Sequence, residues 1–130
     1  MPAITFPEYA RRIADTLNQV VATGEAALLT LQVDHRSGIR GFIAGSLEFA
    51  DGSTLHFREF VDTSQAEPKL MYVYHYQDVE HNLIFRYDNA AHRPALPSSA
   101  HKHIRSGDAE ASPVPTLAEI LDHILRQTNS

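Results

Sequence analysis

Cysteine is absent from the 130 residues of this sequence. Its absence excludes zinc sites built on thiolates, thiol nucleophiles and disulfide redox chemistry, and it fits a reducing compartment. No apolar run approaches the ~18 residues that a membrane-spanning helix needs. The opening residues, MPAITFPEYARR, lack the basic and apolar regions of a signal peptide. These absences predict a soluble, cytoplasmic protein with no membrane contact.

Positive charge is scarce and unevenly distributed. The net charge is −5, yet residues 85–105 hold four cationic side chains against one carboxylate, which gives +3 there and −8 elsewhere. The overall acidity argues against non-specific coating of DNA. A local basic segment that also holds three of the eight histidines is compatible with one confined phosphate site.

The pattern of apolar residues predicts a single α+β domain over residues 1–130. A capping-box pair, Thr5 and Glu8, precedes an amphipathic helix that Gly24 ends, and a similar pair, Thr116 and Glu119, precedes a second helix at the C-terminus. Between the helices, short connections join five strand-like segments, which predicts a five-stranded antiparallel meander. These segments are 26–34, 39–49, 54–61, 69–78 and 82–88. Residues 89–115 read as a long irregular stretch of the functional or disordered kind.

Glycines and aromatic residues add detail to the predicted sheet. Gly41 and Gly45 share one phase of a strand, which indicates a bend or a group packed close to that face. The Asp-Gly pair at 51–52 is typical of a tight hairpin. The alternating tyrosines at 72, 74 and 76 either stack nucleobases or, as alternating aromatics more often do, pack beneath a helix.

The histidine-rich segment holds the strongest chemical signal. Histidine is the side chain best suited to move protons near neutral pH, and a neighbouring cation can hold a phosphate and stabilise charge that develops on it. Attack of an RNA 2′-hydroxyl on the adjacent phosphate needs one histidine as base, one as acid and a cation, with no metal and no cofactor. The histidines of this segment are His92, His101 and His103.

Three other interpretations of the same residues stay open. Histidines in polar loops are often surface residues or hydrogen-bond anchors. His92, His101 and His103, with Asp88 as an oxygen ligand, would instead form a metal-dependent hydrolase or a metal-binding module, although Lys102 between two ligands raises the electrostatic cost of a cation. A third hypothesis is a non-enzymatic domain whose basic loop binds an acidic partner.

A second candidate site lies on the predicted sheet. His56 and Arg58 alternate on one face of their strand, and His75 and Arg86 would join them if the strands pair in a suitable register. Most such residues are solvated strand positions. The register, which the sequence leaves open, therefore decides whether this second cluster exists.

The segment FRYDNAAHRP, followed by AHKHI, resembles a family pattern in which a strand ending FRYDNAPHH precedes a Pro-rich gap and HHKH. The family is that of the TumE-type toxins, which are toxin components of bacterial and archaeal type II toxin–antitoxin pairs. The resemblance covers residues 70–105. The departures are Ala91, Arg93 and Ala100, which stand where the pattern has proline, histidine and histidine. The matching positions are Arg86, Tyr87, Asp88, Asn89, Ala90, His92, His101, Lys102 and His103.

The resemblance and the residue chemistry together suggest a metal-independent endoribonuclease toxin. In this hypothesis His101 and His103 are the acid and base, and His92 is a third proton carrier that Asp88 orients. The partner is a cognate antitoxin that covers the cationic loop with an acidic segment, and a homodimer is compatible with the sequence. Arg86 and Lys102 would contact the scissile phosphate, and Arg93, Arg105 and Arg58 the rest of the RNA.

Overall fold

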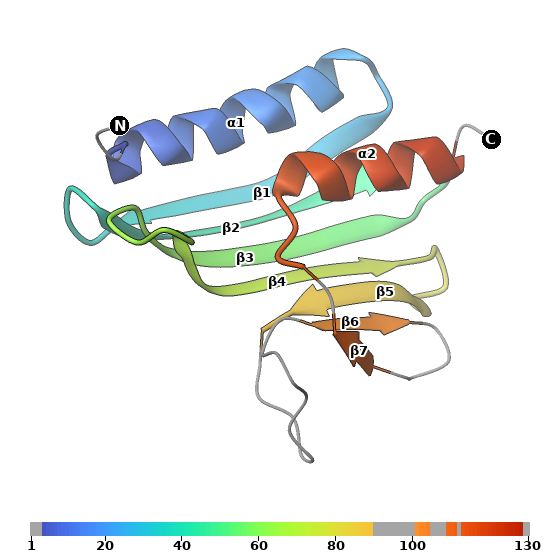
Figure 1. The fold of residues 1–130 in the computed structure, drawn as a ribbon. Helices are drawn as coiled ribbons and strands as arrows, with labels where there is room; N and C mark the ends of the chain where they lie inside the picture. The colour runs from blue at the N-terminus through green and yellow to red at the C-terminus, as the bar shows by residue number, and fades with distance from the viewer. Residues whose placement is uncertain (1–3, 90–100, 105–108, 112, 129–130) are drawn as a thin grey trace.

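The computed structural model describes residues 4–89, 101–104, 109–111 and 113–128. Within these residues the chain forms two helices and seven strands (Figure 1). In chain order they are α1 (Phe6–Ala22), β1 (Ala26–His35), β2 (Arg40–Phe49), β3 (Thr54–Asp62), β4 (Lys69–Gln77), β5 (Leu83–Asp88), β6 (His101–Ile104), β7 (Ala109–Ala111) and α2 (Leu117–Thr128).

The strands form one antiparallel sheet whose spatial order equals their order in the chain. Both described helices, α1 and α2, lie on the same side of this sheet, so neither of them covers its other face (Figure 1). The predicted α+β domain with a five-stranded meander and two terminal helices is confirmed by β1–β5, α1 and α2. The interpretation of residues 89–115 as irregular is wrong in part, because β6 and β7 extend the meander. Their four and three residues are too short to show a period.

The capping residues fix the helix ends as the sequence indicates. The Thr5 hydroxyl accepts a hydrogen bond from the Glu8 amide at 3.3 Å at the start of α1, and Gly24 (φ 80°) lies just past its end. The Thr116 and Glu119 pair forms a complete capping box at α2, since each side chain accepts from the other residue's amide at 3.1 Å. Both helices therefore begin where local chemistry satisfies their first amides.

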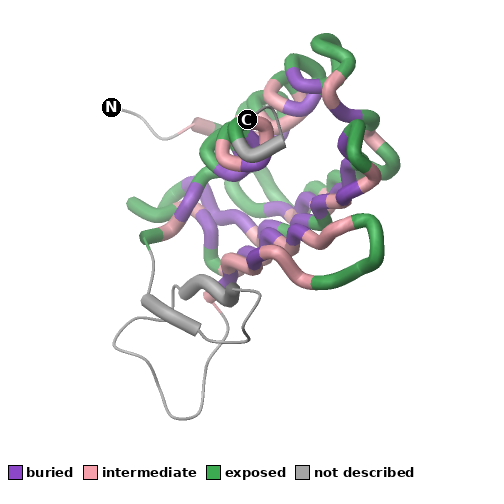
Figure 2. The backbone as a smooth tube through the Cα atoms, turned by 90° about the vertical axis from the view of Figure 1, so that its right-hand side faces the viewer, coloured by how far each residue is buried: buried purple, intermediate pink, exposed green. Residues whose placement is uncertain are grey.

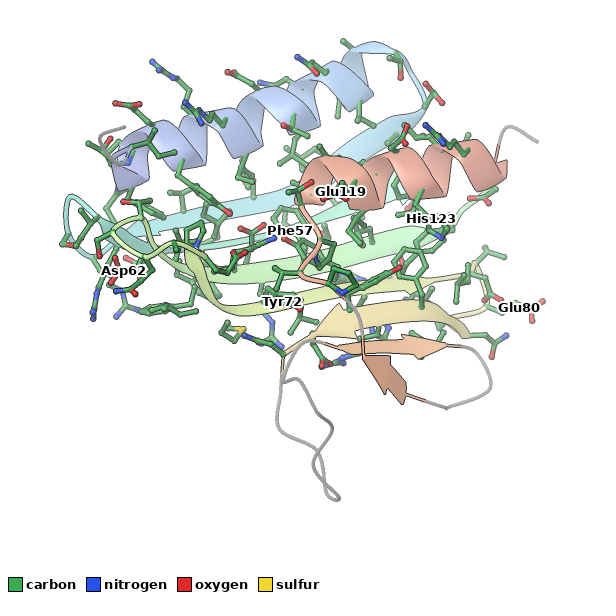
Figure 3. All side chains as sticks on the ribbon, in the orientation of Figure 1. Phe57, Asp62, Tyr72, Glu80, Glu119 and His123 are labelled. Carbon is green, nitrogen blue, oxygen red and sulfur yellow. The ribbon has the colours of Figure 1, made fainter. Side chains whose placement is uncertain are left out.

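The hydrophobic core lies between the helices and the covered face of the sheet (Figure 2). Phe57 of β3 and Tyr72 of β4 are buried there, and both are labelled in Figure 3. The stripe at 72, 74 and 76 is no more than 2% exposed, so these tyrosines pack beneath the helices, and their use as a base-stacking surface is wrong. Gly41 has the close neighbour that its position suggests, because an added Cβ would lie 2.1 Å from the Phe6 ring.

A buried polar network crosses this core. Glu59 is fully buried, and both Tyr9 and Tyr74 donate hydroxyl hydrogen bonds to its carboxylate, the latter at 2.7 Å. The Tyr74 hydroxyl also accepts from Lys69 Nζ at 3.1 Å, and the same ammonium group donates to the Pro115 carbonyl. Burial raises the pKa of Tyr74 and lowers that of Lys69. The network links α1, the sheet and the start of α2.

Candidate functional site

The open face of the sheet contains a hollow of about 630 Å³. Among the residues that the structure describes, the floor and walls of this hollow come from strands β1–β5, and neither α1 nor α2 contributes to them. In contrast with the tyrosines of the covered face, its lining is rich in imidazole and guanidinium groups. The chemically active side chains that line it are His56, Arg58, His75, Gln77 and Arg86, beside the hydroxyls of Thr30 and Ser46.

These side chains come together because their strands pair in one register. Ser46 is directly opposite His56, His56 is opposite His75, and His75 is opposite Arg86. Directly opposed residues of antiparallel strands share a face and lie ~5 Å apart. The four positions therefore form a row across β2–β5 on the open face. The second cluster that the sequence analysis considered, on the sheet, is therefore present on one face, because the register of the strands brings His56, His75 and Arg86 side by side.

The two histidines of the row are close enough to act on one group. The ring centroids of His56 and His75 are 6.5 Å apart. A phosphate that accepts one hydrogen bond of about 2.8 Å from each ring fits between rings at this separation. An acid and a base on either side of one phosphate are what cleavage by an adjacent hydroxyl requires.

Neighbouring groups favour the neutral form of His75. Burial lowers the pKa of His75 below 6.5, and the charges of Arg86 and His56 lower it further, against an opposing hydrogen bond with Gln77. Gln77 donates its amide to His81 Nδ1 at 2.8 Å, so its carbonyl oxygen is turned to His75 Nε2 at 3.2 Å and accepts from it. This arrangement leaves Nδ1 as the basic atom of His75.

Two guanidinium groups flank the histidines. Arg58 is exposed one row along from His56, and no ion-pair or hydrogen-bond partner of its side chain occurs among the residues that the structure describes. Arg86 Nε donates to Asp88 Oδ2 at 2.7 Å, and Asp88 is 2% exposed. The ion pair with Asp88 thus positions the Arg86 side chain at the hollow, while the exposed Arg58 presents a positive charge to a ligand.

Strand β6 extends the row of side chains with residues that the sequence analysis predicted to be functional. His103 is the register partner of Arg86, Lys102 of Tyr87 and His101 of Asp88. His103 is therefore the next position of the row after Arg86, and His101 is two residues away on the same strand. Asp88 binds Arg86, and His92, the histidine that Asp88 is expected to orient, lies outside the described residues.

The remaining predicted residues lie outside the described part of the chain. They are His92, Arg93 and Arg105. The described ranges contain no group of three or more histidine, aspartate or glutamate side chains that could hold a metal ion. The metal alternative, which combined His92, His101, His103 and Asp88, therefore depends on side chains beyond those ranges.

Sequence reasoning missed two contributions to the hollow. Gln77, which fixes the tautomer of His75, is one residue beyond a tyrosine stripe and carries no local signal. Ser46 and Thr30 close the β1 side of the hollow with a hydroxyl–hydroxyl hydrogen bond of 2.7 Å. The small polar residues Thr30 and Ser46 would have indicated that β1 and β2 share this face, but only if the register of the two strands had been known.

The fold and site define a two-layer α+β domain with both helices on one face and a basic, histidine-lined hollow on the other. The chain matches the family model "Toxin TumE" over residues 10–129 and belongs to that family. It is therefore the toxin component of a toxin–antitoxin system, and an antitoxin is its implied partner. Comparison with curated proteins and with solved structures finds no match. No helix in the described ranges is long and apolar enough to cross a membrane.

Proposed function

We propose that this toxin is an endoribonuclease that cleaves RNA phosphodiester bonds by histidine acid–base catalysis, without a metal ion. The observation that supports this most is the row Ser46–His56–His75–Arg86, which places two imidazoles and a guanidinium on the floor of one hollow. Such a set can move two protons and stabilise a phosphorane.

The reaction uses the described groups as follows. His75, neutral because burial and Arg86 lower its pKa, accepts the proton of the RNA 2′-hydroxyl at Nδ1 while the 2′-oxygen attacks the adjacent phosphorus. His56, 6.5 Å away, donates a proton to the departing 5′-oxygen. The products are a 2′,3′-cyclic phosphate and a 5′-hydroxyl. The guanidinium groups of Arg58 and Arg86 hold the phosphate oxygens as their charge increases.

The loop residues that the sequence selected act beside this pair. His103 is the register partner of Arg86 on β6, and its imidazole would exchange a proton with the same phosphate. His92, His101, Lys102, Arg93 and Arg105 remain predicted contributors from the segment that follows β5, as additional acid–base groups and phosphate contacts. The positively charged side chains around the site also raise the electrostatic cost of binding a divalent metal ion, which favours a reaction that needs no metal.

Substitution of each histidine tests the proposal. His75→Asn, His56→Asn and His103→Ala should each slow cleavage by purified toxin about 10²- to 10⁴-fold and relieve growth arrest on induced expression. His35→Asn, on β1 and outside the hollow, is the matched control and should leave both unchanged. If all three variants arrest growth as the parent does, the assignment is wrong.

The substrate and the buffer supply two further tests. A substrate with a 2′-deoxynucleotide at the scissile position should resist cleavage, because the attacking hydroxyl is missing. Cleavage should persist in excess chelator. Loss of activity in chelator that added metal restores would establish the metal hydrolase instead, and salt-sensitive RNA or antitoxin binding with no cleavage under any condition would establish a non-enzymatic binding domain.

The antitoxin is proposed to cover the same hollow with an acidic segment. Arg58 is exposed and has no described ionic partner, so a carboxylate placed over it would gain a charge-assisted hydrogen bond. Binding of the antitoxin should then weaken as salt rises, and Arg58→Gln should weaken it more than Arg36→Gln, whose guanidinium is already paired with Asp34.

A further inference from the structure

The open face carries an apolar row beside the histidine row. Phe42 of β2 is the register partner of Phe60 of β3, and Phe60 is opposite Met71 of β4. All three residues are half-buried, unlike the fully covered aromatic residues of the other face. Since α1 and α2, the helices that the structure describes, both lie on the far side of the sheet, neither of them covers this row (Figure 1).

This apolar row is aligned with the proposed chemistry. His56, Arg58 and Phe60 are successive open-face positions along β3, at steps of about 7 Å for every two residues. The strand therefore presents an acid–base group, a phosphate-binding cation and an aromatic ring in sequence on one face. A second ring, Phe42, lies next to Phe60 across the β2–β3 ladder.

The charged side chains around the apolar row favour a nucleic-acid strand whose bases face the sheet. Asp62, at one end, is tied to Arg40 Nε at 2.9 Å, and Asp88 is tied to Arg86. Those pairs neutralise their own carboxylates, which leaves Arg58, between the aromatic row and the histidine row, as the cation with no described partner. A ligand with alternating flat apolar rings and phosphates matches this alternation of rings and charge.

We propose that Phe42 and Phe60 stack nucleobases and that the substrate is therefore single-stranded RNA, which lies across the open face with a phosphate at Arg58 and the histidines. This inference rests on the proposed function, since it names the substrate class of the same site. In a duplex the faces of the bases are stacked on one another, so they cannot reach two rings on a sheet. In a single strand the faces are accessible, and any base can stack.

Binding measured apart from cleavage tests the inference. The probe is a fluorescent RNA with a 2′-deoxynucleotide at the scissile position, single-stranded or annealed to its complement, titrated with toxin. Phe42→Leu and Phe60→Leu should each weaken single-strand binding about 5- to 150-fold, while Phe60→Tyr, which keeps the ring, should bind as the parent does. The parent should bind the duplex much more weakly than the single strand.

A kinetic measurement separates stacking from a general disturbance of the site. The single-turnover cleavage rate at saturating RNA should be unchanged in Phe60→Leu, whereas the RNA concentration that gives half-saturation should rise. Unchanged thermal denaturation of the variant confirms that it folds. A fall in the saturated rate without a change in half-saturation would overturn the stacking role.

The two proposals fail in different ways. If the toxin cleaves RNA but both leucine variants bind as the parent does, and duplex is cleaved as fast as single strand, the stacking inference is overturned and the ribonuclease stands. If the toxin binds single strands in a phenylalanine-dependent manner but never cleaves them, the nuclease proposal is overturned and the stacking surface stands.

Discussion

Three tyrosines on β4 offer a graded test of the buried polar network. Tyr72, Tyr74 and Tyr76 alternate on the covered face and are each no more than 2% exposed, so Tyr→Phe makes the same chemical change at three equivalent depths. The hydrogen-bond partners of their three hydroxyl groups differ. The hydroxyl of Tyr74 donates to Glu59 and accepts from Lys69, that of Tyr76 is 2.7 Å from the Ser53 hydroxyl, and that of Tyr72 has no hydrogen-bond partner among the described residues.

The expected losses follow from those partners. A hydrogen bond to a charged group contributes ~1.5–3 kcal/mol, a neutral one ~1 kcal/mol, and an unpaired buried hydroxyl carries a desolvation penalty of ~1–3 kcal/mol. Tyr74→Phe should therefore destabilise by about 3 kcal/mol, since Glu59 loses one of its two tyrosine donors and Lys69 an acceptor. Tyr76→Phe should cost about 1 kcal/mol, and Tyr72→Phe should be neutral or stabilising.

Urea denaturation of the three variants, followed by circular dichroism, gives the free energies of unfolding. The order of stability should be Tyr72→Phe, then Tyr76→Phe, then Tyr74→Phe, with a fall in melting temperature of about 10 °C for the last. Equal losses in all three variants, or the largest loss in Tyr72→Phe, would refute the assignment of stabilising energy to the charged network rather than to burial of the rings.

Two further outcomes follow from the site and the core. Proton NMR should give His75 a titration midpoint below 6.5, and Arg86→Gln should raise that midpoint because the substitution removes a positive charge that lowers the pKa. In the pH window just below 6.5 the unfolded chain binds a proton at this position and the folded chain does not, so the stability of the fold should fall there as the pH falls. A midpoint at or above 6.5 would contradict the assignment of His75 as a neutral base. Gly41→Ala should destabilise by about 1–3 kcal/mol because its Cβ would meet the Phe6 ring at 2.1 Å, whereas Gly38→Ala, with open space around it, is the control and should be near neutral.

Local chemistry makes the helices and the first five strands readable from the sequence. The pairs Thr5/Glu8 and Thr116/Glu119 satisfy amides within a single turn, so their effect depends on no distant residue. The alternation of apolar residues in β3 and β4 likewise reports burial of one face, whatever lies over it. The same periodicity cannot say whether a buried tyrosine meets a helix or a base, which is why the stripe on β4 admitted both interpretations.

The short strands β6 and β7 could not be read in this way. Their residues, HKHI and AEA, have no alternating apolar pattern, and each strand is stabilised by its pairing with a neighbour rather than by a buried face of its own. Sequence composition singled out His101, Lys102 and His103 for their chemistry. It could not reveal that a β-ladder fixes them beside Arg86 and Asp88.

The candidate site depends on register, which is a global property of the sheet. His56 and His75 meet because residues 54–60 of β3 pair in step with residues 77–71 of β4, and a slip of one residue would move every β4 side chain to the opposite face. Such a slip would bring His75 and Met71 into the core and would expose Tyr72, Tyr74 and Tyr76, of which Tyr74 donates a hydrogen bond to Glu59. The cost of exposing those rings and removing one of the two tyrosine donors of the buried Glu59 carboxylate excludes the slip. The buried network on one face therefore holds the histidines together on the other.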